Sequence, residues 1–229
     1  MSDAPTSPNE DEDVMMVDVP AEPIYVFVNG ILTFPGLSAN WTGRAVTWCI
    51  NRRRFAEKVE YWVGPISRVL GQKYRARKLA KTLWYYLTDT PWRVRLVAHS
   101  NGNNVVVNAL RYLQYPYIDE LHMVAPACPA NFDVTMLNYM LRNGRIGRLF
   151  IYQGKNDVPV KVAGKSVIAR KILGYGGLGR ANELEMNIDP SIRDKVEIRQ
   201  WEGGHSIFFQ PENIDKFMWS VVEPDQKEA

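Results

Sequence analysis

Short apolar runs and longer amphipathic stretches alternate along the chain, and each kind predicts a different element. Short runs rich in apolar residues are typical of strands, and they occur at 24–28, 57–62, 93–98, 120–125, 147–153 and 195–201. Stretches typical of helices lie at 43–54, 72–88, 101–114, 133–143, 160–173 and 211–221. In the second of these, Ala76, Leu79, Ala80 and Leu83 recur at helical spacing.

Strands that alternate with helices predict βαβ crossovers. We therefore expect an α/β fold with a mostly parallel sheet of about six strands flanked by helices. In open parallel sheets, functional groups gather beyond the carboxyl ends of the strands. The residues that follow each predicted strand are the ones to search for chemistry.

Charge is spread unevenly along the 229 residues, of which 46% are hydrophobic. Residues 1–22 hold seven acids and no Lys or Arg, whereas residues 23–229 hold 28 basic residues against 18 acids, a net charge of +10. We expect a disordered acidic tail at 1–22, one folded domain at 23–222 and a frayed end at 223–229. The acidic start lacks the order of a secretory signal, and no apolar run is long enough to span a bilayer, so a cytoplasmic location is expected.

Residues 44–81 form a strongly basic region, with eleven Lys or Arg and two acids. One interpretation is attraction to an anionic surface, either nucleic acid or phospholipid headgroups. The other is a solvated helix face around an apolar stripe. The two cysteines, Cys49 and Cys128, form neither a disulfide framework nor a metal site, and we expect no metal.

The strand at 93–98 leads directly into Ala98-His99-Ser100-Asn101-Gly102 and then into an apolar helix. A serine in a tight strand-to-helix turn is held above the sheet, and its neighbours two positions away must be small because strand and helix nearly touch there. The N-terminus of the following helix favours negative charge developing at the serine. This pattern predicts Ser100 as a nucleophile, in preference to a simple helix cap.

A serine nucleophile needs a base, and the base needs an acid to orient it. Asp157 follows the strand at 147–153, and His205 follows the strand at 195–201 on a Gly-rich loop. Asp133, after the preceding strand, is the rival for the acid. We expect Asn101 and Ile31 to supply the two backbone N–H groups of an oxyanion hole. Further residues expected at the pocket are Asn29, Gly30, His99 and Cys128.

Four motifs in this order, VFVNG, AHSNG, QGKND and GGHS, resemble those of the α/β-hydrolase superfamily, in its serine esterase and lipase-like branch. The resemblance covers residues 24 to about 220 and implies hydrolysis of a carboxylic ester or thioester by Ser100, His205 and Asp157, without a cofactor. Ala98 replaces the first Gly of the usual elbow, and Asn29 replaces the His that often begins the oxyanion turn. The alternatives are an acyltransferase or amidase with the same triad, or a non-catalytic scaffold that binds an anionic partner.

Connection lengths bear on how the substrate, expected to be a small or lipid-like acyl compound, reaches the site. The segment 126–146 has room for one helix, so no large cap domain is expected. The longer connection 163–193 is rich in glycine, and we expect it to form a small mobile lid. Phe34, Trp41 and Trp201 are candidates for an apolar acyl site, with core packing as the alternative.

Overall fold

The computed structural model describes residues 22–30, 40–61, 71–113, 117–127, 134–158 and 188–225. Several predictions fall outside these residues: the acidic tail, the helix at 160–173 and most of the proposed lid. Four residues predicted at or near the site also lie outside the described ranges, namely Ile31, Phe34, Cys128 and Asp133. The predicted domain boundaries therefore stay predictions.

The described elements follow the expected alternation of strand and helix. The strands are β1 (Pro23–Val28), β2 (Phe55–Val59), β3 (Arg93–His99), β4 (Ile118–Val124), β5 (Ile146–Gly154) and β6 (Val196–Trp201). The α-helices are α1 (Trp41–Asn51), α3 (Gln72–Thr88), α4 (Gly102–Leu110), α5 (Val134–Arg142) and α8 (Ile214–Val222). Two 3₁₀ helices complete them, η3 (Pro190–Lys195) and η4 (Ile207–Phe209).

The six strands form one sheet in the order β2-β1-β3-β4-β5-β6, and each pairing is parallel. This confirms the predicted α/β class and the six-strand sheet. Since all these strands run the same way, their carboxyl ends share one side of the sheet, which we call the carboxyl edge. The segments predicted to carry the chemistry begin there.

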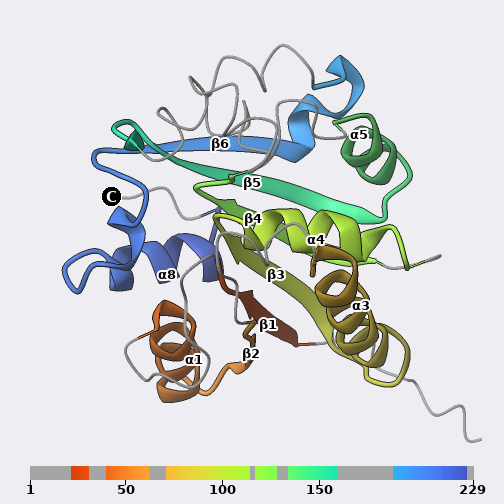
Figure 1. Cartoon of the computed structure of the whole chain (residues 1–229), viewed down its shortest axis with the longest axis horizontal. Helices are drawn as coiled ribbons and strands as arrows, with labels where there is room; N and C mark the ends of the chain where they lie inside the picture. Colours follow the sequence, from red (N-terminus) through yellow and green to blue (C-terminus); the bar gives the residue numbers. More distant parts are fainter. Residues whose placement is uncertain are drawn as a thin grey trace, which may run out of the picture.

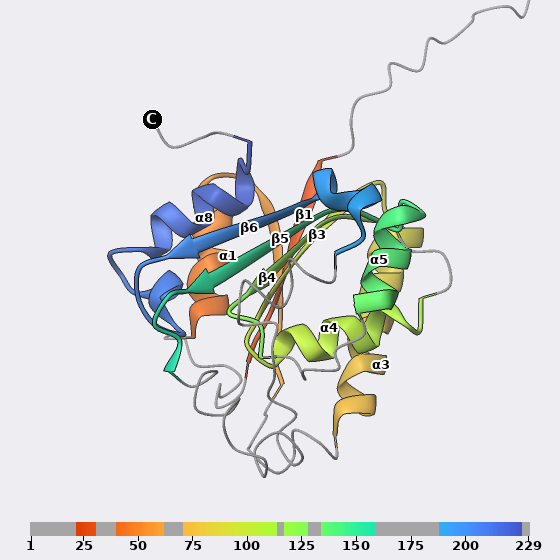
Figure 2. The ribbon, with the colours of Figure 1, turned by 90° about the horizontal axis from the view of Figure 1, so that it is seen from above.

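Helices cover both faces of the sheet, as the two views in Figures 1 and 2 show. One face carries α3, α4 and α5 over an aliphatic core that includes Leu79, Val105 and Leu137. The other carries α1 and α8 over a more aromatic core that includes Trp48 and Phe217. Among the described helices, none is both long and apolar enough to cross a membrane.

Element ends differ from the predictions by a few residues. The strand predicted at 57–62 is β2, Phe55–Val59. It is an edge strand in which only Val59 is buried, so its apolar pattern defines its ends weakly. The helix predicted to reach residue 54 ends at Asn51, because Arg53 adopts a φ of 56°. The helix predicted from residue 211 begins at Ile214.

His122 lies in the core, as a core histidine with its hydrogen bonds satisfied. It is fully buried on β4, with Nε2 3.1 Å from a Glu120 carboxylate oxygen and Nδ1 3.1 Å from the Tyr152 hydroxyl. Burial lowers the pKa of His122 from its ordinary value, while Glu120 opposes that shift. The Tyr152 hydroxyl in turn donates to the carbonyl of Ser220, and an Arg95 nitrogen donates to that of Val222 at 2.8 Å. This network satisfies carbonyls at the end of α8 and fastens that helix to the sheet.

Candidate active site

Ser100 lies in a sharp turn between β3 and α4. Its φ of 53° falls in the left-handed region, which costs a residue with a Cβ on the order of 1 kcal/mol. The Ser100 N–H donates to the carbonyl of Val124 at 2.9 Å. The Asn103 side-chain amide donates to the carbonyls of Ser100 and Val124, at 3.0 and 3.1 Å. These bonds hold the turn in the geometry of the predicted strand-to-helix elbow.

Small residues at this turn allow β1 to pack directly against it. A Cβ on Gly102 would lie 2.6 Å from the carbonyl oxygen of Asn29 and 2.9 Å from that of Val28. A Cβ on Gly30 would lie 2.9 Å from the Cβ of Ser100. Both positions therefore need glycine, because a side chain there would collide with the neighbouring segment. As a result, the turn after β1 packs directly against Ser100.

Asp157 and His205 come together at the carboxyl edge. His205 Nδ1 lies 2.8 Å from Asp157 Oδ2, and Asp157 is only 3% exposed. Because a carboxylate only accepts, Nδ1 donates, and Nε2 remains as the nitrogen that can take up a proton. The carboxylate on Nδ1 also fixes the orientation of the His205 ring.

The loops that carry this pair pack against each other. The Asn156 N–H donates to the carbonyl of Gly203 at 2.8 Å. A Cβ on Gly154 would lie 2.7 Å from the carbonyl oxygen of Gly204, so the end of β5 needs glycine to approach the histidine loop. Gly203 has a φ of 134°, a conformation that side chains disfavour. Gly154 thus permits the close backbone contact between the two loops, and Gly203 permits the turn before His205.

His99 connects the elbow to the histidine loop. Its Nε2 lies 3.2 Å from the backbone carbonyl of His205, and the two rings are 4.9 Å apart. Its ring also meets Trp41 and Phe209 edge-on. Burial, helped by the nearby His205, lowers the pKa of His99 to about 3. The ring is therefore neutral, and Nε2 donates to the backbone carbonyl of His205, the residue predicted to be the base.

This contact brings the three predicted catalytic residues to one place, because His99 precedes Ser100 and touches His205. Among the hydrogen bonds of the described residues, none joins the Ser100 hydroxyl to His205. Bonds of this kind often shorten only when substrate binds. The predicted nucleophile, base and acid thus occur in the chain order expected of a serine hydrolase, and a hydrogen bond from Ser100 to His205 would complete the predicted triad.

Two asparagines predicted at the site differ in what they do. The Asn29 side chain donates to the carbonyl of Tyr61 at 2.8 Å and accepts from the Tyr61 N–H at 2.9 Å. It therefore joins the ends of β1 and β2, and its place at the pocket stays a prediction. Asn101 caps α4 and is 2% exposed, with no hydrogen-bond partner for its side-chain oxygen among the described residues. Its backbone N–H is correctly placed in the sequence for an oxyanion donor, whereas Ile31 and Cys128 lie outside the described residues.

Asn103 and the His99 contact are features that the sequence analysis missed. An Asn in the first turn of an otherwise apolar helix was the available signal for Asn103, which is fully buried. The hydrogen bond from His99 to the carbonyl of His205 depends on how two distant loops meet, so no local sequence pattern could predict it. Trp41 stacks on Phe209 at 4.2 Å, and Trp201 packs on Phe208 at 5.3 Å, which favours core packing for both tryptophans.

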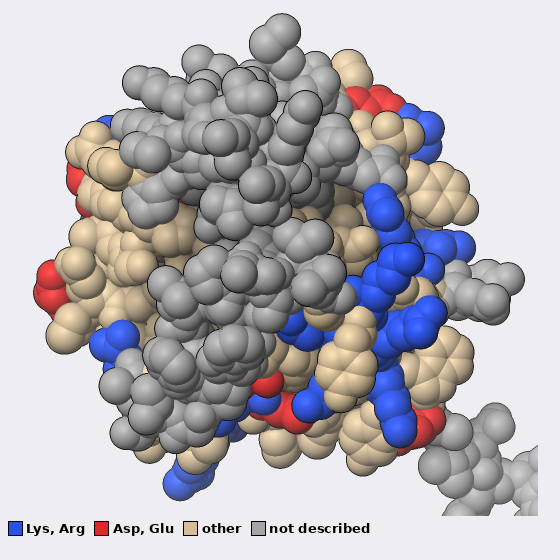
Figure 3. Space-filling model, viewed as in Figure 1, with Lys and Arg blue, Asp and Glu red and all other residues tan. Residues whose placement is uncertain are grey.

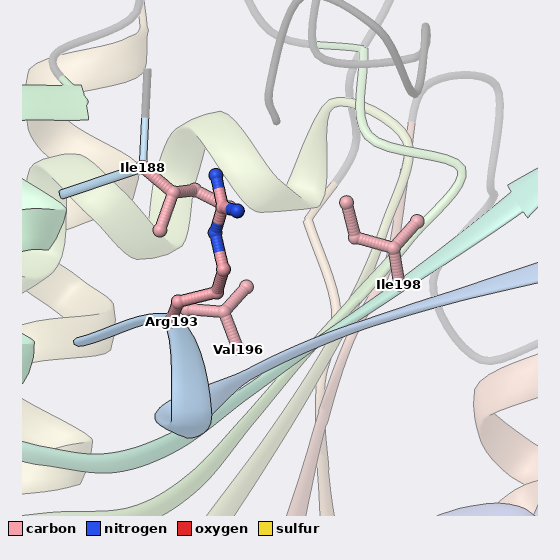
Figure 4. Close-up of a pocket in the computed structure, with 4 residues that line it drawn as sticks. All are labelled: Ile188, Arg193, Val196 and Ile198. Carbon is pink, nitrogen blue, oxygen red and sulfur yellow. The ribbon is translucent and has the colours of Figure 1, made fainter. Parts of the chain in front are cut away.

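A pocket lies at the start of β6, towards the opposite end of that strand from His205. Figure 4 shows Arg193 of η3 reaching beside Ile188, with Val196 at its base and Ile198 further along β6. The four described residues of its lining include no nucleophile, so we do not assign it to the chemistry. Among the described residues, no group of three or more His, Cys, Asp or Glu is arranged to hold a metal ion.

No protein-family model matches the sequence, and no curated protein matches it either. Solved structures do match the fold. A putative hydrolase of the α/β superfamily from Xanthomonas campestris has a TM-score of 0.55 at 13% identity, over 90% of this chain and 99% of its own. An esterase from Pyrococcus furiosus has a TM-score of 0.55 at 12% identity, over 89% of this chain and 81% of its own.

Two further solved structures match the same fold. Est1E from Butyrivibrio proteoclasticus has a TM-score of 0.51 at 14% identity, over 92% of this chain and 89% of its own. An uncharacterised protein from Bacillus cereus has a TM-score of 0.56 at 13% identity, and this chain spans 65% of its length. The chain therefore has the fold of the α/β-hydrolase superfamily, as its motifs led us to expect.

Proposed function

We propose that the chain is a serine hydrolase that cleaves a carboxylic ester or thioester. The observation that carries this proposal is the buried Asp157–His205 pair, at 2.8 Å, joined through His99 to the left-handed turn at Ser100. Esterases among the structures of similar fold support the same reaction class. A scaffold that only binds a partner has no need of this pair beside a strained serine.

The proposed reaction has two halves. His205 Nε2 takes the proton of the Ser100 hydroxyl as the oxygen attacks the acyl carbon, and the Asn101 N–H at the start of α4 stabilises the oxyanion. His205 then gives that proton to the leaving alcohol or thiol, which leaves an acyl group on Ser100. In the second half, His205 takes a proton from water, the resulting hydroxide attacks the acyl carbon, and the proton returns to Ser100 as the acid departs.

The test is turnover of short p-nitrophenyl esters and of a matching thioester. Ser100→Ala should lower kcat by about 10⁴-fold or more, because removing a triad nucleophile leaves only binding and oxyanion stabilisation. Ser206→Ala is the matched control, since Ser206 is exposed and adjoins His205, and it should keep full activity. Turnover that survives in folded Ser100→Ala protein would assign the nucleophile elsewhere.

A further inference from the structure

The structure divides the basic region 44–81 into two parts. Several of its cations pair with acids: Arg52 with Asp215 at 3.0 Å, and Lys58 with Glu60 at 3.3 Å. Those pairs need no outside partner. The exposed cations on α3 have no acid on their own helix, whose sequence is QKYRARKLAKTLWYYLT.

The apolar stripe of α3 packs on the sheet and leaves one continuous outer face. Ala76, Leu79, Ala80 and Leu83 are buried in the core. The outer face repeats at helical spacing. We call it the α3 face, and its exposed residues are Lys73, Tyr74, Arg77, Lys78, Lys81, Trp84 and Tyr85.

The cations of the α3 face are not neutralised within the described part of the chain. Lys73, Arg77, Lys78 and Lys81 form no ion pair there, and the ring contacts they make are Arg77 over Tyr112 at 5.5 Å and Lys78 over Tyr61 at 5.9 Å. Figure 3 shows Lys and Arg side chains gathering over the α3 side of the molecule, with uncharged side chains between them. Four exposed cations that form no ion pair with the described residues would attract an anionic partner.

Exposed aromatic residues share this face. Tyr74 is 72% exposed, Trp84 50% and Tyr85 53%, and Tyr112 at the end of α4 is 43% exposed. Tyr and Trp have an apolar ring and a polar group, so they are favoured where lipid headgroups meet hydrocarbon. Cations near the start of a helix and amphipathic rings along it match a bilayer surface better than the evenly charged groove that follows a nucleic-acid backbone.

The α3 face also begins beside the carboxyl edge. Lys78 lies over the ring of Tyr61, which Asn29 joins to the end of β1. The next residue, Gly30, contacts Ser100. A surface bound to the α3 face would therefore lie close to the candidate site.

We propose that the α3 face binds the protein to anionic phospholipid membranes. The binding does not rest on the proposed ester chemistry, so Ser100→Ala should bind vesicles as the wild type does. The headgroups contribute phosphate and carboxylate charge to the four cations, and the interfacial region accommodates Trp84 and Tyr85.

Vesicle flotation tests the proposal with the full chain. Wild-type protein should float with phosphatidylcholine vesicles that contain phosphatidylserine and stay behind with phosphatidylcholine alone. Lys73→Gln/Arg77→Gln/Lys81→Gln should weaken partitioning on the order of a hundredfold, because each basic residue near an anionic leaflet contributes about fivefold. Raising the salt concentration should weaken wild-type binding in the same direction.

A control variant removes the same charge elsewhere. Arg53, Arg193 and Lys216 are exposed on other elements, so Arg53→Gln/Arg193→Gln/Lys216→Gln should float as the wild type does. Wild-type protein that ignores phosphatidylserine, or equal losses in the two triple variants, would overturn the proposal. So would duplex DNA that binds the protein while vesicles do not, since that would assign the face to nucleic acid.

Discussion

Gly102→Ala would probe how the nucleophile turn is held against β1. The added Cβ would lie 2.6 Å from the carbonyl oxygen of Asn29, whereas ordinary contacts begin at 3.4 Å. The opposing atom is backbone, so it cannot rotate away. The elbow and the end of β1 must instead separate by about 0.8 Å, which also moves the Gly30 turn away from Ser100.

This displacement sets the expected loss of stability and the expected loss of kcat. Forcing a methyl group into a packed site costs about 1 to 3 kcal/mol of the free energy of unfolding, offset in part by the lower chain entropy of Ala. A misplacement near 1 Å at a catalytic site costs about a hundredfold in rate. We therefore expect a folded protein with moderately reduced stability and roughly a hundredfold lower kcat.

Gly147→Ala is the matched control. Its Cβ would also lie 2.6 Å from a backbone carbonyl oxygen, that of Asp119, but near the start of β5 and away from the carboxyl edge. Urea denaturation should give similar losses of stability in both variants, while ester turnover per folded molecule should fall only in Gly102→Ala. Equal turnover in the two variants would refute the claim that the β1 contact positions Ser100.

Three further predictions concern the site. Asp157→Asn should lower kcat by about 10⁴-fold with little change in KM, because His205 loses the charge that orients it; a loss below tenfold would direct attention to Asp133. Burial lowers the pKa of His99 to about 3, against 6.5 in the unfolded chain. Between these pH values only the unfolded chain binds a proton at His99. The free energy of unfolding therefore falls by about 1.4 kcal/mol for each pH unit below 6.5. Urea titrations at pH 7 and pH 5 should show a smaller drop in His99→Phe, and equal drops would contradict the burial argument. Asn103→Ala should cost about 2 kcal/mol in the same titrations, since two buried carbonyls lose a donor; an unchanged midpoint would show that water replaces the amide.

The class of fold and the positions of Ser100, Asp157 and His205 could be read from local patterns. Apolar runs report buried strands, and parallel strands carry their following residues to one edge regardless of the loops between them. The same logic fails at β2, because an edge strand buries little and its pattern sets no limits. Side-chain bonds between distant segments, such as Asn29 with Tyr61, depend on tertiary approach, which no local pattern contains.

In the basic region 44–81, too, the sequence shows one part of the picture and the folded chain another. Its charge is visible in the sequence, but the acids that neutralise Arg52 and Arg54 lie more than 160 positions away, at Asp215 and Glu223. Only the folded chain separates these paired cations from Lys73, Arg77, Lys78 and Lys81 of α3, which form no ion pair with the residues that the structure describes. The structure thus turns a broad charge pattern into one helix face that can be tested by three substitutions.

Active-site labelling tests the central claim most directly. Folded wild-type protein would be treated with a fluorophosphonate, followed by intact mass measurement and mapping of the modified peptide. We predict a single adduct on Ser100, absent from Ser100→Ala and strongly slowed in Asp157→Asn, because the serine reacts only when His205 is oriented to take its proton. A folded protein that gains no adduct, or gains it on another residue, would contradict the assignment of this site as a serine hydrolase centre.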